Sequence, residues 1–111
     1  MIDMNENQVF YISIPQFNDS FSRVIIKNVA YLIRFTYEMA SDCWVFGIFD
    51  LKYNPIVQGI KIVPGIPLNL QYTDDTLPPV YWIAKSKLDR IGYRDFWDGK
   101  AEFLYVEKPE E

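Results

Sequence analysis

The 111-residue sequence contains no histidine, so the commonest general base and the commonest zinc ligand are both missing. It has one cysteine, Cys43, which excludes an internal disulfide and leaves no Cys–His pair for nucleophilic catalysis. Cys43 follows Asp42 and begins an apolar run, and this position predicts a buried, unreactive thiol. Only five glycines are present, and none forms a Gly-rich phosphate loop. We therefore expect no enzyme activity, no metal and no cofactor.

Basic charge and long apolar runs are also scarce. Eleven Lys and Arg face fifteen Asp and Glu, and the net charge of −4 argues against a nucleic-acid partner. No apolar run approaches the roughly 20 residues of a membrane helix. The opening "MIDMNENQ" is acidic and polar, whereas a signal peptide begins with a basic and then an apolar region. These features predict a soluble protein made in a reducing cytoplasm, without membrane or nucleic-acid partners.

Carboxylates are the remaining candidates for chemistry. Asp74 and Asp75 are adjacent, but nothing nearby supplies further ligands at calcium-loop spacing, so we interpret them as part of a solvated turn. Glycoside hydrolysis needs two carboxylates at a defined separation, which this sequence does not reveal. The acids that would have to supply such a pair are Asp50, Asp89, Asp95, Asp98 and Glu102.

Hydrophobic and aromatic residues are abundant, at 50% and 17% of the chain, which is enough for the core of one domain. Short segments alternate with a period of two, and no stretch of 12 residues follows a helical period. We expect strands at 9–14, in two arms of a hairpin over 20–37, and at 43–49, 56–63, 80–85 and 101–107. The pattern predicts an all-β fold: a small single-domain β-sandwich or partly open β-barrel of about seven short, mostly antiparallel strands.

The same pattern predicts the domain limits and the turns. Residues 1–8 are expected to be a flexible N-terminal segment, 9–107 the single domain and 108–111 a disordered tail. Hairpin turns are expected at Lys27-Asn28 and within residues 50–55. Gly59 predicts a bulge, and Pro64-Gly65 suits the centre of a type II turn.

Alternation also predicts which side chains form the core. One face of the strand after the hairpin turn carries Val29, Tyr31, Ile33, Phe35 and Tyr37, and we assign this face, with its rings of Tyr31, Phe35 and Tyr37, to the core. Trp44 and Phe46 share a face that should be buried. Arg23 and Arg34 are expected to point to solvent or to pair with nearby acids, and their alternative role is pairing between subunits.

The 15-residue stretch 86–100 lacks strand alternation and concentrates residue types that are typical of interface hot spots. Its candidate partner-binding residues are Arg90, Tyr93, Arg94, Phe96 and Trp97. A loop of this length is usually functional or disordered, and its aromatic content argues against disorder. The alternative is that the aromatic side chains fold down over one end of the β-domain and close its core.

The order of these features resembles the phage baseplate plug family, a group of small all-β tail proteins. The resemblance covers "ISIPQFNDSFSRVIIKNVAYLIRFTYE", "CWVFGIFDLKYNPIVQGIKIVPGIPL" and the closing "AEFLYVE". Its strongest marker is a strand led by Trp44, a turn ending in Asn54-Pro55, and the element "GIKIVPG" at 59–65. Two features depart from the family pattern: Lys27-Asn28 stands where a Gly is usual, and residues 93–100 are more aromatic.

The resemblance implies a structural virion component in the central hub of a tail baseplate, assembled in the host cytoplasm. It implies no catalytic residue, metal or cofactor. Its partners would be other baseplate proteins (hub, spike, tube or wedge), with several copies, three or six, in a symmetric assembly. The alternative function is a lectin-like carbohydrate-binding domain that uses Trp44, Trp82 or Trp97 as a sugar platform.

Overall fold

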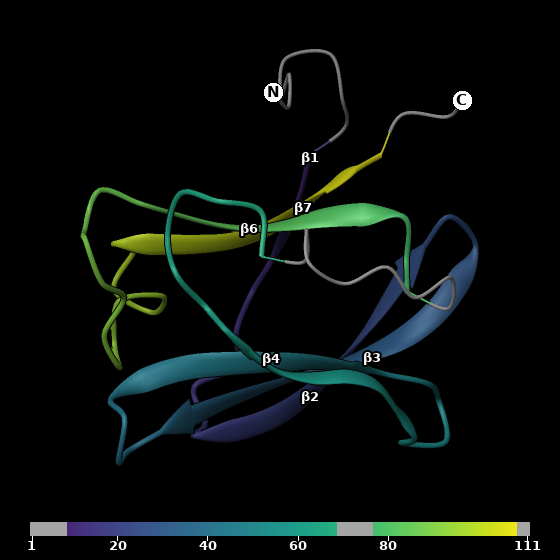
Figure 1. Cartoon of the computed structure of the whole chain (residues 1–111), viewed down its shortest axis with the longest axis horizontal. Helices are drawn as coiled ribbons and strands as arrows, with labels where there is room; N and C mark the ends of the chain where they lie inside the picture. Colours follow the sequence, from purple (N-terminus) through teal and green to yellow (C-terminus); the bar gives the residue numbers. More distant parts are fainter. Residues whose placement is uncertain (1–8, 69–76, 109–111) are drawn as a thin grey trace.

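In the computed structural model, which describes residues 9–68 and 77–108, seven strands form two antiparallel sheets that face each other (Figure 1). The three-stranded sheet has the order β1 (Val9–Ile12), β7 (Ala101–Glu107), β6 (Val80–Ser86). The four-stranded sheet has the order β2 (Asp19–Ile26), β3 (Val29–Glu38), β4 (Cys43–Phe49), β5 (Pro55–Lys61). The described residues contain no helix, and the sheets do not close into a barrel. The predicted all-β fold is confirmed, in its sandwich form.

The turn between β2 and β3 has the predicted two-residue form. Lys27 and Asn28 have φ of 50° and 70°, and Ile26 lies opposite Val29. Positive φ at both central residues gives the turn the twist that its strands require, and Asn adopts this conformation readily. The prediction of a hairpin centred on Lys27-Asn28 is confirmed.

The β4–β5 pair also follows the sequence prediction, with one correction. The loop 50–54 is closed by the Asp50 N–H, which donates to the Asn54 carbonyl at 3.0 Å. Gly59 has φ of 76° beside an irregular register between β4 and β5, as expected for a bulge. The strand predicted at 56–63 ends at Lys61, because the chain then leaves this sheet.

Residues 62–68 cross from the four-stranded to the three-stranded sheet. The Ile62 N–H still bonds the Trp44 carbonyl of β4 at 2.9 Å, whereas the Gly65 N–H donates to the Ala84 carbonyl of β6 at 3.0 Å. The Leu68 N–H then donates to the Trp82 carbonyl at 2.8 Å. Gly65, with φ of 91°, takes the positive φ that a turn at Pro64-Gly65 requires. This stretch therefore links the two sheets and covers the outer edge of β6.

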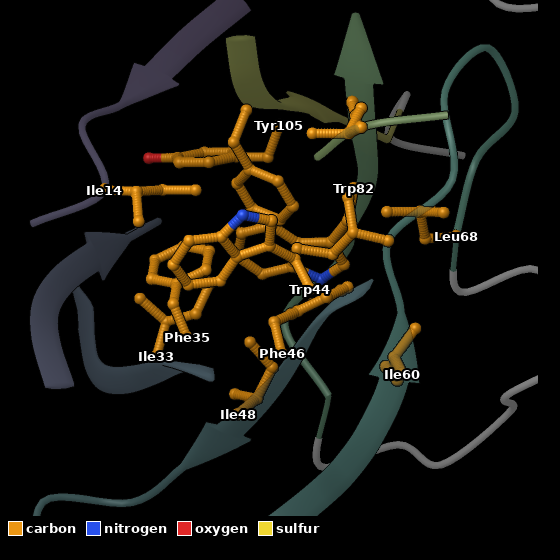
Figure 2. Close-up of a cluster of buried hydrophobic side chains, with 14 of the residues drawn as sticks. Ile14, Ile33, Phe35, Trp44, Phe46, Ile48, Ile60, Leu68, Trp82 and Tyr105 are labelled. Atoms are coloured by element: carbon orange, nitrogen blue, oxygen red, sulfur yellow. The ribbon is translucent and has the colours of Figure 1, made fainter. Parts of the chain in front are cut away.

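The core lies between the sheets and contains a group of aromatic side chains that contact one another, surrounded by aliphatic ones (Figure 2). Trp44 and Phe46 are 0% and 1% exposed, so the prediction that they share a buried face is confirmed. Across the interface, the Phe103 ring of β7 meets the rings of Phe35 and Phe46 with centroids 5.1 Å away in each case. Edge-to-face rings of this kind contribute beyond the area they bury.

One assignment to the core is wrong. Ile33, Phe35 and Tyr37 are buried and Tyr31 is partly buried, but Val29 is 50% exposed. Val29 directly follows the hairpin turn, so along its strand it has neighbours on one side alone. Alternation assigns a side chain to a face of the sheet, but it does not show where along the strand the covering layer stops.

Candidate functional site

The 86–100 loop joins β6 to β7, and its two ends are tied together. The Ser86 hydroxyl donates to the Lys100 carbonyl at 2.7 Å and accepts the Leu88 N–H at 3.1 Å. Ile91, near the centre of the loop, is buried in the core. The Ser86 side chain therefore joins the two ends of the loop, and the buried Ile91 side chain attaches the loop to the core.

The second half of the loop is a series of hydrogen-bonded turns. The Asp95 carboxylate accepts the Gly92 N–H at 2.6 Å, as Asp does when it caps its own turn. The Arg94 carbonyl accepts the N–H groups of Trp97 and Asp98 at 3.0 and 2.9 Å. These bonds give a segment without strand pairing a definite shape.

The aromatic side chains of the loop turn inward, onto Trp44 of β4. Tyr93 stacks on the Trp44 ring with centroids 6.3 Å apart, and Trp97 meets it edge-on at 5.8 Å. Phe96 adds a further edge-on contact at 6.1 Å. The Trp97 Nε1–H donates to the Ile14 carbonyl at 3.1 Å, and the Tyr93 hydroxyl donates to the Asn18 side chain. Tyr93, Phe96 and Trp97 are thus partly buried, as the core-closing interpretation predicts.

The arginines of the loop point the other way. The Arg90 and Arg94 side chains are 60% and 63% exposed. Arg90 pairs with Asp42, at the turn before β4, while Arg94 lies 3.7 Å from Asp98 and 5.8 Å from the Trp97 ring centre. Exposed pairs of this kind contribute little to stability. Of the five candidate residues, two therefore present charge to solvent and three pack on the core, and a contact with a partner remains a prediction.

An open groove of about 310 Å³ lies beside the loop. One wall comes from the chain that leaves β1, and the other comes from the end of the loop and the start of β7. Its lining residues are Tyr11, Ile12, Ser13, Ile14, Gln16, Phe96, Trp97, Ala101, Glu102 and Phe103. No local sequence pattern marks the first wall, because it meets Trp97 through a contact between residues 83 positions apart.

The sugar-platform alternative is wrong for two of its three tryptophans. Trp44 and Trp82 are 0% and 1% exposed, so neither presents a ring face to a ligand. They are buried because each lies on the inner face of its sheet, where large apolar side chains gain most from leaving water. Trp97 is partly exposed, but its ring packs on Trp44.

The carboxylates named as possible catalytic acids include two that stabilise turns. Both oxygens of Asp50 accept hydrogen bonds within its own loop, from the N–H of Lys52 and Asn54 and from the Asn54 side chain. The hydrogen bond from the Asn54 N–H is the main reason that the pKa of Asp50 is lowered. A carboxyl group that acts as a general acid needs a raised pKa instead. Asp95 is held by Gly92, as described above. Asp74 and Asp75 lie outside the described residues.

Arg34 and Cys43 lie where the sequence predicted. Arg34 pairs with Asp19, with Nε 2.7 Å from Oδ1, and this hydrogen bond is the main cause of the lowered pKa of Asp19. Cys43 is buried, as predicted.

Within residues 9–68 and 77–108, no cluster of three or more His, Cys, Asp or Glu is placed to hold a metal. The same residues include no helix with the length and apolarity to span a membrane.

Comparison with known protein families finds a match over most of this chain. The family model described as cyanophage baseplate Pam3 plug gp18 matches residues 9–109. This range includes every strand of both sheets and the whole 86–100 loop. A comparison with curated proteins finds no match.

Proposed function

The chain belongs to the family of the cyanophage baseplate plug, and from this membership we propose that it closes the central hub of a phage tail baseplate, between the tail tube or hub protein and the spike. The family match over residues 9–109 is the observation that carries the proposal. It supports a structural component of the virion tail that contacts other baseplate proteins. The position between hub and spike is the finer part of the proposal.

The role proposed here is mechanical and involves no catalytic step or cofactor. A part that fills a fixed place in an assembly needs a stable shape and complementary surfaces. The core between the sheets supplies the stable shape. The hydrogen-bonded turns of the 86–100 loop hold the surface of that loop in place. Three or six copies, assembled in the host cytoplasm, would match the symmetry of phage tails.

We propose that the contact with a neighbouring baseplate protein lies on the 86–100 loop and the adjoining groove. Arg90 and Arg94 supply two exposed guanidinium groups, each with an acid beside it that holds its direction. Phe96 and Trp97 form part of the groove wall, and the Arg94 guanidinium lies 5.8 Å from the Trp97 ring centre. Arginine flanking a partly apolar groove is a common composition for an interface anchor. Such a surface would suit a partner segment with an acidic group beside an apolar side chain.

The test uses the variant Arg90→Ala/Arg94→Ala. Both side chains are exposed, so the purified chain should melt within a few degrees of the unchanged protein. An interface anchor is worth roughly 2 kcal/mol, or about 30-fold in affinity. Phage particles produced with the variant as the sole source of this chain should therefore contain much less of it, measured by immunoblot of purified virions.

Lys52→Ala/Lys61→Ala is the matched control, since it removes the same charge from exposed positions outside the 86–100 loop and its groove. This control should enter virions normally. Normal incorporation of the arginine variant would reject the loop as the contact surface. Absence of the unchanged chain from purified virions would reject the baseplate role itself.

A further inference from the structure

The long edge of the four-stranded sheet is formed by β2, which pairs with β3 on one side alone. The Tyr37 N–H donates to the Asn18 carbonyl directly opposite it, at 2.7 Å. In an antiparallel pair such bonds recur at every second residue, so the even-numbered residues of β2 bond β3. The N–H and C=O groups of Asp19, Phe21, Arg23 and Ile25 therefore point away from the sheet, and among the described residues no backbone group bonds them.

The other three sheet edges are protected. The strand β5 begins with Pro55 and is interrupted by the bulge at Gly59, and β6 is covered by residues 64–68. The strand β1 has only four residues. By contrast, β2 has eight residues with no proline or glycine, and an edge of this kind is a template for a further strand.

The side chains along this edge carry opposite charges that are placed symmetrically about one residue. The run Asp-Ser-Phe-Ser-Arg occupies positions 19–23, with opposite charges two residues either side of Phe21. If a second β2 lies antiparallel with Phe21 on the two-fold axis, Asp19 faces Arg23 of the second copy and Ser20 faces its Ser22. The residues with outward-pointing N–H and C=O then form the hydrogen-bonded pairs. The outward-pointing backbone groups and the opposite charges of Asp19 and Arg23 therefore favour the same register.

From this agreement we propose that β2 pairs with β2 of a second copy of this chain, antiparallel about a two-fold axis through Phe21, joining the two four-stranded sheets into one. A two-fold axis through Arg23 would instead place two guanidinium groups directly opposite each other, which is destabilising. The partner is thus a second copy of the chain, because the charge pattern of β2 is complementary to itself in this register.

The surroundings of the edge fit this pairing. Phe21 is 39% exposed and meets Phe49 and Tyr53 edge-on, with ring centres 5.2 and 5.0 Å away. Two such clusters would meet at the axis. Asp19 already pairs with Arg34, yet its side chain remains 47% exposed, so it can accept a second guanidinium. The pairing does not depend on the proposed baseplate role.

Sedimentation velocity of the full chain over a range of concentrations tests the proposal. The unchanged chain should form a dimer. Arg23→Asp places like charges opposite each other twice and should weaken the dimer on the order of tenfold. Lys85→Asp makes the same charge change on β6 and should leave the dimer unchanged. Circular dichroism of each variant checks that it is folded.

Cysteine cross-linking tests the register. Phe21→Cys places two thiols at the axis, with Cα atoms about 5.5 Å apart, which a disulfide can span. Arg23→Cys places its thiol opposite Asp19 of the second copy, so two such thiols lie too far apart. Oxidation should therefore give a covalent dimer with Phe21→Cys alone. A chain that stays monomeric at every concentration, or equal cross-linking by both variants, would overturn the proposal.

Discussion

At the scale of single residues, Trp44 joins the fold to the candidate site. It is fully buried on β4, and the rings of Tyr37, Tyr93, Phe96 and Trp97 surround it. Its Nε1–H has no hydrogen-bond partner in the part of the chain that the structure describes, so it stabilises the protein through packing. Three of those rings come from the 86–100 loop, and the loop therefore depends on Trp44 for its position.

Replacing Trp44 with Ala should lower the free energy of unfolding by about 3–5 kcal/mol, as for large buried aromatics generally. This loss is comparable with much of the stability of a small domain. Urea unfolding followed by circular dichroism measures it. Met39→Ala serves as the control, because Met39 is 71% exposed and should change the result by less than about 0.5 kcal/mol. A loss below about 1 kcal/mol for Trp44→Ala would contradict the packing described here.

Alternation predicted Trp44 and Phe46 correctly because a period of two is a local property of any strand. It failed at Val29, since the end of the covering layer is set by the rest of the fold. The 86–100 loop shows the same limit. Its composition indicated both an interface and a core closure, and the structure divides these between the exposed arginines and the buried rings. That division depends on Ile14 and Asn18, which are distant in sequence.

At the scale of elements, the turns were the most predictable feature, because Asn, Asp, Pro and Gly act on the neighbouring backbone. The loop 50–54 is an example, with the Asp50 carboxylate accepting hydrogen bonds from two N–H groups of its own turn. The crossing at 62–68 was less predictable. Its apolar residues fit a longer β5 equally well, and only the pairing with β6 shows where they go.

The Asp50 turn should make stability depend on pH. Its folded pKa is lowered below the ordinary 3.8, so the unfolded chain binds more protons in the window between the two values. The stabilisation that the Asp50 carboxylate contributes is thus fully present above the ordinary pKa. It is lost as the pH falls through the folded pKa. Asp50→Asn keeps the acceptor oxygen but removes the charge, and it should flatten the fall in melting temperature on acidification.

Melting temperatures between about pH 6 and about pH 2 measure this effect. Asp89→Asn, at an exposed carboxylate that makes no hydrogen bond within the described residues, is the control and should leave the slope unchanged. Asp19, whose pKa is lowered mainly by its hydrogen bond from Arg34, should maintain part of the slope in both variants. If Asp50→Asn has the same slope as the unchanged chain, the turn bonds do not act as described.

At the scale of the whole molecule, the two sheets are held together by aromatic rings that meet across the core. Phe103 of β7 contacts both Phe35 of β3 and Phe46 of β4, and Trp82 of β6 contacts Phe46. No local pattern in the sequence specifies these partners, because each pair joins distant parts of the chain. The contacts predict that both sheets unfold as one cooperative unit, as expected of a small domain.

A double-mutant cycle on Phe35 and Phe103 tests this coupling directly. Their rings are edge-to-face with an interplanar angle of 86°, so Phe35→Leu and Phe103→Leu each remove the same ring contact. The two losses in unfolding free energy should therefore fail to add, with a coupling of about 0.5–1.5 kcal/mol. Phe35→Leu combined with Phe10→Leu is the control cycle. Phe10 stacks on Tyr105 and shares no ring contact with Phe35, so these losses should add within about 0.5 kcal/mol. Additive losses for Phe35 and Phe103, or separate transitions for the two sheets in urea, would show that the sheets are not coupled through these rings.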